Sequence, residues 1–341
     1  MAGESATGGS NYRGQSIDLY INSSCNLTCS SCFLGDHYFS TGQFMTVAGA
    51  SSIMRWAVNQ GVDDVAFLGG EPTLHPQLAT ILTVARDLGI RTNRLVSNGT
   101  APFRRLIQGS HGHLIDRVHL SLDGATAAVN DTVRGTGAFD NVVRAIRLTA
   151  QFEIPTIINH TVNRSNLKHI HDMIEFAENT DCEVLNIHWL SAMGRATNGA
   201  LSVTPDEWTE VCNIVARHTP RRSGFAVECQ AAFVSVTQRH QWATSVNENA
   251  CSVRSFENLQ FMPDGRVYIC GLLVDIPDIN TFTWSGSELI PSSAYRTERT
   301  ICADYHGPGC PARLTMSRDL RYDKDRFVPV CIYERIENKR G

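Results

Sequence analysis

The chain has 341 residues, 42% of them hydrophobic and 19% charged, so it can form one large or two smaller globular domains. Its 30 Lys and Arg against 34 Asp and Glu give a net charge of −4, and no long run has one sign. This balance favours neither nucleic acid nor a membrane surface as a partner. No run of about 18 apolar residues predicts a transmembrane helix. The composition also excludes a disordered, collagen-like or coiled-coil protein.

The first 15 residues are small and polar and lack the basic and apolar regions of a secretory signal. We therefore predict a flexible N-terminus over residues 1–15 and a cytoplasmic location. The chain has 11 cysteines, an odd number that argues against a framework of disulfides. Clustered cysteines in a reducing compartment usually bind metal or take part in redox chemistry.

Residues 16–200 alternate short apolar runs with helical patterns, which is typical of parallel strands joined by helical crossovers. The strands are predicted at Ile17–Asn22, Val65–Gly69, Leu95–Ser97, Arg117–Leu122, Thr156–Val162 and Val184–Leu190. The helices are predicted at Ala50–Asn59, Pro76–Leu88, Phe139–Gln151 and Leu167–Asn179. Six such units predict a partial (β/α)6 TIM-like barrel, an α/β fold whose ligands bind at the carboxyl ends of the strands.

The pattern changes after residue 200. Thr204-Pro205-Asp206-Glu207 is a capping box that predicts a helix to about His218, within a helical and irregular connector over residues 201–249. A β-hairpin is predicted around Asp264-Gly265. It lies in a small cysteine-rich domain over residues 250–341, which has little periodicity and would need a metal centre as a crosslink.

Cys25, Cys29 and Cys32 directly follow the first predicted strand. Three thiols on one loop at a strand's carboxyl end can converge on one metal centre. Four thiolates suit structural zinc or a saturated iron–sulfur cluster, whereas three leave one coordination position open for a substrate. No fourth Cys lies close by and the nearest His is His37, so the spacing favours iron–sulfur, with a zinc knuckle as the alternative.

This C-x3-C-x2-C run resembles the signature of the radical S-adenosylmethionine (SAM) superfamily. Further similarities follow at the ends of the predicted strands: Gly69-Gly70-Glu71-Pro72 resembles the GGEP motif, Ser97-Asn98-Gly99 the (S/T)NG motif, and Ser121-Leu122-Asp123-Gly124 the SLDG motif, with Arg134-Gly135 after it. Each match is weak by itself, because Gly-Gly and Asp-Gly are common in turns. Their order and their places at strand ends make the joint signal specific.

The resemblance implies that the cluster on Cys25, Cys29 and Cys32 binds SAM. It places Glu71 of the GGEP motif at the SAM amino group, Ser121 and Arg134 at the carboxylate, and Asp123 at the ribose. Leu190 would lie near the adenine, and Phe33 would replace the aromatic residue that the family often has where this chain has Ser31. The chemistry agrees, because glycines allow close backbone approach, Glu71 suits an ammonium and Arg134 suits a carboxylate.

A second set of cysteines resembles the auxiliary-cluster domain called SPASM. Cys251, Gly265 and Cys270 match its opening, and Cys310 follows a Gly-rich segment as in its later part. The full domain needs more cysteines than remain here, so the chain is more similar to the shortened twitch form with one auxiliary [4Fe–4S] cluster. The ligands would be Cys251, Cys270 and Cys310, with Cys302 favoured over Cys331 as the fourth. Zinc at this position is the alternative.

Cys182, Cys212 and Cys229 match no motif and are predicted to be small buried residues. His188 ends a predicted strand and could line a substrate cavity, although a core histidine is the simpler interpretation. His188 and Arg195 are candidates for the group that takes a proton from the substrate.

The resemblance implies a radical SAM oxidoreductase. It would cleave SAM reductively to a 5′-deoxyadenosyl radical, take a hydrogen from a substrate, and lead to oxidation or to a carbon–carbon or carbon–heteroatom bond. The substrate is predicted to be a sugar, aminocyclitol or nucleoside of natural-product biosynthesis, and a flavodoxin or ferredoxin would supply the electron. Maturation of a ribosomal peptide is the alternative, and an iron–sulfur electron carrier is the alternative without catalysis.

Overall fold

The computed structural model describes residues 16–197, 199–236, 258–274, 280–292, 325–329 and 335–337. Cys270 lies within these ranges. The other predicted auxiliary ligands, Cys251, Cys302, Cys310 and Cys331, lie outside the described residues, as does the predicted flexible N-terminus.

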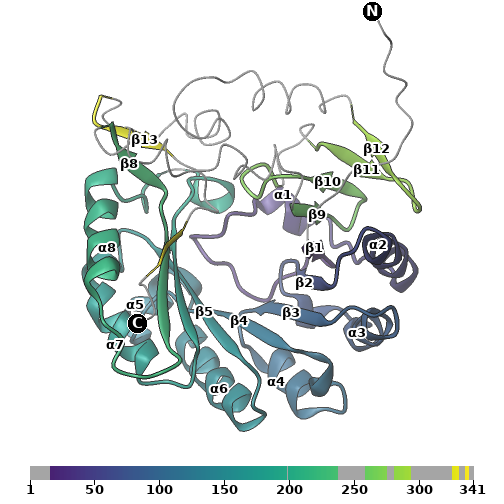
Figure 1. The fold of residues 1–341 in the computed structure, drawn as a ribbon, viewed down its shortest axis with the longest axis horizontal. Coiled ribbons are helices and arrows are strands. Elements are labelled where there is room, and N and C mark those ends of the chain that lie inside the picture. Colours follow the sequence, from purple (N-terminus) through teal and green to yellow (C-terminus); the bar gives the residue numbers. More distant parts are fainter. Residues whose placement is uncertain are drawn as a thin grey trace, which may run out of the picture.

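A curved sheet with helices on its outer side forms the body of the protein (Figure 1). Each of the first six strands pairs in parallel with the next one along the chain. They are β1 (Ser16–Tyr20), β2 (Asp64–Leu68), β3 (Thr92–Ser97), β4 (Arg117–Ser121), β5 (Thr156–Val162) and β6 (Val184–Trp189). This order confirms the predicted partial barrel, because every carboxyl end lies at the same rim.

The sheet continues beyond the six predicted strands at both edges. β7 (Ala226–Gln230) pairs in parallel with β6, within the stretch predicted to be irregular. At the other edge, β9 (Asn258–Phe261) pairs in parallel with β1. The described strands therefore include eight neighbours in one parallel order, β9-β1-β2-β3-β4-β5-β6-β7.

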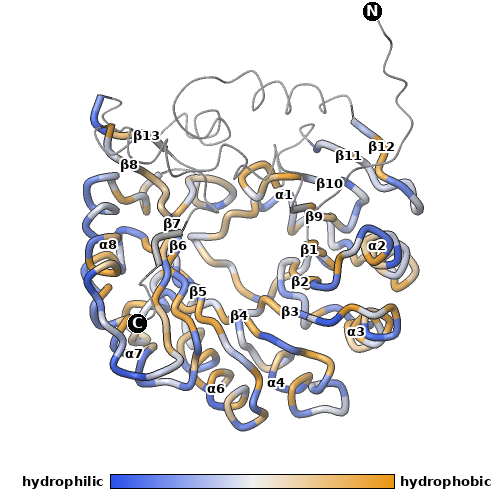
Figure 2. The backbone as a smooth tube through the Cα atoms, in the orientation of Figure 1, coloured by the Kyte–Doolittle hydropathy of each residue, from blue (hydrophilic) through white to orange (hydrophobic). Residues whose placement is uncertain are grey.

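Most predicted helices are confirmed to within a few residues: α2 (Val47–Asn59), α3 (Leu78–Asp87), α6 (Ala138–Gln151), α7 (Ile170–Glu178) and α8 (Pro205–Arg217). The predicted capping box starts α8, since the Thr204 side chain accepts from the Glu207 backbone N–H and the Glu207 side chain accepts in return. Figure 2 shows hydrophobic and hydrophilic segments alternating along α2 and α3, as expected of helices that cover a sheet on one side only.

Three short helices were not predicted: α1 (Asp36–Ser40), α4 (Ala101–Gln108) and α5 (Ala127–Arg134). The last two begin just after the motifs that end β3 and β4, so they bring their first residues to the rim. None of the described helices is long and apolar enough to cross a membrane.

The predicted hairpin is confirmed, with β9 antiparallel to β10 (Arg266–Tyr268) and Gly265 at a φ of 85° in the turn. β11 (Phe282–Trp284) and β12 (Leu289–Pro291) extend this edge. Three described strands remain. β8 (Phe233–Ser235) pairs antiparallel with β13 (Phe327–Pro329), and β14 (Arg335–Glu337) pairs antiparallel with β7.

Candidate active site

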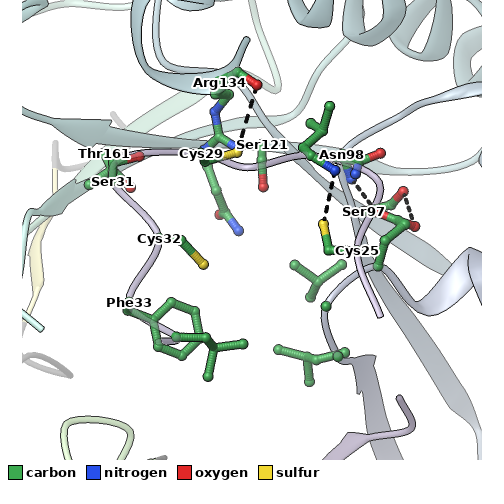
Figure 3. A pocket seen from close by; sticks show the side chains of 18 of the residues that line it. Cys25, Cys29, Ser31, Cys32, Phe33, Ser97, Asn98, Ser121, Arg134 and Thr161 are labelled. Carbon is green, nitrogen blue, oxygen red and sulfur yellow. Dashed lines mark hydrogen bonds between the residues drawn. The ribbon is translucent and has the colours of Figure 1, made fainter. Parts of the chain in front are cut away.

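A cavity of about 320 Å³ lies at the carboxyl rim of the strands and is lined by all three cysteines of the predicted cluster. In Figure 3 the side chains of Cys25, Cys29 and Cys32 surround one open space. The strand-end motifs supply much of the remaining wall: Gly69, Gly70, Glu71, Ser97, Asn98, Ser121 and Arg134. Phe33, His188 and Arg195 also line it. Folding thus brings together most of the predicted site residues.

Residues 24–34, which we term the cysteine loop, contain Cys25, Cys29 and Cys32. Backbone hydrogen bonds hold this loop at several points. The Glu71 N–H donates to Ser24 O over 2.7 Å, and the Ser30 N–H donates to Val133 O over 2.9 Å. At the other end, the Arg195 N–H donates to Cys32 O over 2.9 Å. The loop is therefore fixed to segments that follow three different strands, β2, β4 and β6.

The thiols lie in an environment that keeps them protonated without a metal. Burial raises the pKa of Cys25 to about 12, and burial also raises the pKa values of Cys29 and Cys32, although the Arg134 guanidinium opposes the rise at Cys29. Metal binding at these thiols would release protons, because thiolates are the ligands.

Three thiols that line one cavity can serve as ligands of one iron–sulfur cluster. Within the described residues, no three His, Cys, Asp or Glu side chains are grouped so that they could hold one metal ion. An iron–sulfur cluster takes one thiolate at each of several irons and so accepts ligands that are further apart. The three cysteines around one cavity therefore fit such a cluster.

Glu71 is buried, and its carboxylate is held by four hydrogen bonds. Oε1 accepts from Ser97 Oγ at 2.9 Å, from the Thr73 N–H at 3.1 Å and from Thr73 Oγ1 at 2.6 Å. Oε2 accepts from the Asn98 N–H at 2.8 Å. Burial raises the pKa of Glu71, and these donors oppose the rise. Together they fix an anionic group in the cavity wall where an ammonium group could bind.

Asp123 lies behind the cavity wall, and it does not line the cavity as the predicted ribose contact would require. It is fully buried, its Oδ2 lies 2.7 Å from Arg134 Nε, and its Oδ1 accepts from the Thr161 N–H at 2.8 Å. Despite the cost of burial, the neighbouring Asp123 carboxylate raises the pKa of Arg134. Asp123 thus orients Arg134, which does line the cavity and can present its fork to a carboxylate.

Arg195 is held in place from two sides. Its Nε donates to Asp36 Oδ1 over 2.6 Å, and its guanidinium carbon lies 4.3 Å from the centre of the Phe39 ring. A guanidinium has only donors and stays protonated in proteins, so Arg195 does not suit the predicted role of proton acceptor. It can instead bind an anion or position the cysteine loop.

A second cavity of about 240 Å³ adjoins the first. The residues that line both are Tyr20, Ser31, Phe33, Thr161 and His188. Leu190 lines the second cavity and not the first, and Pro72 lines neither. Pro72 instead begins a short 3-10 helix that follows Glu71. Of the two predicted proton acceptors, His188 lines both cavities and Arg195 lines only the first.

Close contacts with the backbone explain why glycine stands at two positions of the rim, Gly70 and Gly194. A Cβ at Gly70 would lie 2.2 Å from Ser24 O, and a Cβ at Gly194 would lie 2.3 Å from the carbonyl carbon of Phe33. Gly194 also has a φ of 59°, a conformation that favours glycine. Both positions bring backbone against the cysteine loop, which a side chain would displace.

Sequence reasoning missed several residues of the wall. Asn159 and Thr161 alternate on β5 and both line the first cavity. Their signal was present, since two polar residues separated by one position near a strand's carboxyl end share one face of the sheet. Asp36 holds Arg195, which lines the cavity. No sequence pattern indicated this contact, because it joins residues far apart in the sequence.

Comparisons with known proteins find relatives of this chain. Residues 19–177 match the model of the Radical SAM superfamily. An AdoMet-dependent heme synthase of Oleidesulfovibrio alaskensis is 31% identical over 57% of this chain and 50% of its own length. The sporulation killing factor maturation protein SkfB of Bacillus subtilis is 29% identical over 60% of this chain and 50% of its own length. The chain thus spans about half the length of these curated relatives.

The fold has solved counterparts. The crystal structure of Streptococcus suis SuiB bound to S-adenosylmethionine superimposes with a TM-score of 0.70 and 15% identity, covering 92% of this chain and 77% of that one. The matched residues 19–177 contain the cysteine loop and the strand-end motifs up to Arg134. Residues 19–177 therefore form a domain of the Radical SAM superfamily.

Proposed function

We propose that the protein is a radical SAM enzyme that cleaves S-adenosylmethionine reductively and takes a hydrogen atom from a substrate. Members of the superfamily use a [4Fe–4S] cluster and SAM. The observation that carries the proposal is the single cavity lined by Cys25, Cys29 and Cys32 together with Glu71 and Arg134. When bound, the cluster supplies one electron to the sulfonium of SAM.

The chain's own residues bind and orient SAM in this proposal. The fixed Glu71 carboxylate would accept the amino group, and Arg134 would donate to the carboxylate. Ser97, Asn98 and Ser121 line the same wall, and Phe33 would cover the adenine. Leu190 lines the second cavity, where either the edge of the adenine or the substrate could contact it.

An auxiliary [4Fe–4S] cluster forms the second part of the proposal. Cys270 follows β10 and is buried, and the next two residues, Gly271 and Leu272, line the second cavity. An auxiliary centre on Cys270 would therefore lie next to the second cavity. The remaining ligands would be Cys251, Cys310 and either Cys302 or Cys331.

The second cavity supports a small substrate. Its described wall combines hydroxyl, amide and imidazole groups with apolar surface and has no Asp, Glu, Lys or Arg; examples are Ser191, Gln230, Gln260 and Met193. At about 240 Å³ it lies below the roughly 300–1,000 Å³ that is usual for ligand sites. We therefore favour a small molecule that carries several polar groups, such as a sugar, aminocyclitol or nucleoside intermediate.

Peptide maturation is the second candidate. The relative SkfB is named as a maturation protein and is about as similar as the heme synthase, so sequence identity does not separate the two substrate classes. Purified enzyme should be offered small hydroxylated intermediates and candidate precursor peptides in parallel. A product about two hydrogens lighter than one of them would identify the class.

Variants of the three cysteines test the proposed radical SAM activity directly. After anaerobic reconstitution, the protein should contain about eight irons per chain with two cubane clusters or about four with one. It should form 5′-deoxyadenosine from SAM and dithionite. The C25A/C29A/C32A variant should lose this activity, whereas Cys182→Ala, which removes a buried thiol outside both cavities, should keep it. Wild-type protein with bound iron but no 5′-deoxyadenosine would instead support an electron carrier.

A further inference from the structure

Helices α4 and α6 pack side by side on the outer surface of the sheet and carry a concentration of positive charge (Figure 1). Their sequences contain four arginines and one aspartate, Asp140, although the chain as a whole has a net charge of −4. Three of these arginines, Arg104, Arg105 and Arg144, form what we term the arginine trio.

A hydrogen bond of Arg104 links α4 to α6, the helix that carries Arg144. Arg104 Nη1 donates to Gly99 O over 3.0 Å and to Asn141 Oδ1 over 2.9 Å. Asn141 lies three residues before Arg144 on α6 and so shares its face. Burial, together with the like charges of Arg144 and Arg105, lowers the pKa of Arg104.

No carboxylate among the described residues forms an ion pair with any member of the trio. Like charges held close together destabilise the folded protein unless an anion relieves them. Arg105 and Arg144 are exposed to solvent, so a partner can reach them.

The start of α4 lies beside the cysteine loop. Thr100, the residue before α4, accepts a hydrogen bond from Asn26 Nδ2 over 2.9 Å, and Asn26 follows the ligand Cys25. Arg104 is one helical turn further along α4. The loop also presents its other side to solvent: Cys25 and Cys29 line the cavity, whereas Asn26, Thr28 and Ser30 are exposed. The exposed side of the cysteine loop is therefore joined to the start of α4, the helix that carries Arg104 and Arg105.

We propose that the arginine trio is the docking surface for a small acidic electron-carrier protein that reduces the cluster. The inference rests on the proposed function, since that function needs one electron at this loop. Charge complementarity identifies the partner, because a positive patch accelerates association with an acidic protein. The step moves one electron: the carrier is oxidised by one electron, the cluster is reduced by one, and no bond forms or breaks.

Stopped-flow absorbance of the reconstituted protein tests the proposal. Flavodoxin hydroquinone serves as the carrier, and photoreduced 5-deazariboflavin serves as a small reductant without the carrier's acidic surface. The R105E/R144E variant should be reduced by flavodoxin at least about tenfold more slowly than wild type at low salt. High salt should shrink this difference. Reduction by 5-deazariboflavin should not change.

Matched variants and a binding measurement complete the test. Arg217→Glu changes an exposed arginine at the end of α8 and should leave flavodoxin reduction unchanged, and R105K/R144K should retain most of the wild-type rate. An equal effect of R217E, or an equal loss with 5-deazariboflavin, would overturn the proposal.

Binding of oxidised flavodoxin, measured by biolayer interferometry, does not depend on the cluster chemistry. Weaker binding of R105E/R144E than of wild type would support the docking surface even if no 5′-deoxyadenosine forms. If the double variant loses affinity only for heparin and not for flavodoxin, the trio serves another anion and the proposal fails.

Discussion

Glu71 is the residue whose surroundings most constrain its chemistry. All four of its hydrogen bonds come from donors, two of them on Thr73, so an ionised carboxylate fits and an amide does not. In Glu71→Gln one donor would face the side-chain NH2. We expect a loss of stability of about 2 kcal/mol and at least tenfold weaker SAM binding. Thermal unfolding and isothermal titration calorimetry measure the two effects.

The exposed Glu175 on α7 provides the control for this substitution. Glu175→Gln should change neither quantity. Unchanged SAM affinity in Glu71→Gln would show that the carboxylate does not hold the amino group.

The buried His160 should make the free energy of unfolding depend on pH. It is buried on β5, and its Nδ1 lies 3.0 Å from Leu122 O, a carbonyl that can only accept. Nδ1 therefore carries the proton of the neutral ring. Burial lowers the pKa of His160, and it also lowers the pKa of His75. The unfolded state then binds more protons than the folded state below about pH 6.5, so stability falls as the pH drops through that value.

The expected slope is at most about 1.4 kcal/mol per pH unit for each of these histidines. Melting temperatures between pH 7.5 and 5.5 should fall less steeply in His160→Gln than in wild type, because one titrating group is gone. Parallel curves for the two proteins would contradict this assignment.

The sequence motifs predicted the location of some site residues but not the orientation of others. The motifs located Glu71, Ser97 and Arg134, because each follows a predicted strand and strand ends meet at one rim. The motifs did not predict that the buried Asp123 carboxylate pairs with Arg134, and its contact with the ribose stays a prediction. The orientation of its carboxylate depends on α5, which places Arg134 beside it and was not itself predicted.

At the scale of elements, the loop after β6 acts as a support for the cysteine loop. Gly194 contacts the backbone of Phe33 and Leu34 so closely that no Cβ fits. Gly194→Ala should therefore displace the cysteine loop, destabilise the protein and lower the iron content after reconstitution. Iron and sulfide assays together with thermal unfolding measure these effects.

Gly199 provides a matched control. It has a similar φ of 67°, but among the described residues a Cβ there would meet only Ser202 Oγ, at 4.0 Å. Gly199→Ala should cost about 1 kcal/mol through backbone strain and leave the iron content unchanged. Equal iron contents in the two variants would show that the contact with Phe33 does not support the cluster.

Strands and long helices were predictable because their apolar patterns are local. β7 was missed because Ala226–Gln230 includes Glu228 and Gln230 and lacks a continuous apolar run. Helices α4 and α5 were missed because each has only eight residues, too few for a clear helical period. Both helices nevertheless shape the site, since α4 begins beside the cysteine loop and α5 ends at Arg134.

At the scale of the whole molecule, the later part of the chain returns to the first strand. The sequence predicts a division near residue 250, and this boundary stays a prediction. β9, which lies beyond it, pairs with β1 from Ser16 to Leu19 and so extends the barrel sheet. Such pairing joins segments some 240 residues apart, and no local pattern encodes it.

An aromatic cluster of Trp56, Phe261 and Trp284 connects α2 with this returning segment. The three ring centres lie 5.8–5.9 Å apart, and Trp284 Nε1 donates to Ser52 Oγ over 3.1 Å. Since the cluster joins both parts of the chain, we expect β1 and β9 to unfold together. Trp284→Ala should destabilise both by about 2–4 kcal/mol, whereas Trp284→Phe should keep the ring contacts and lose about 1 kcal/mol.

Hydrogen exchange resolved by mass spectrometry distinguishes one cooperative unit from two. In Trp284→Ala, peptides that cover β1 and β9 should lose protection to the same extent, because each strand supplies hydrogen bonds to the other. Peptides from β4 and β5, in the middle of the sheet, should lose less. If β9 exchanges freely while β1 stays protected, the returning segment is a separate unit and the pairing contributes little to the stability of the barrel.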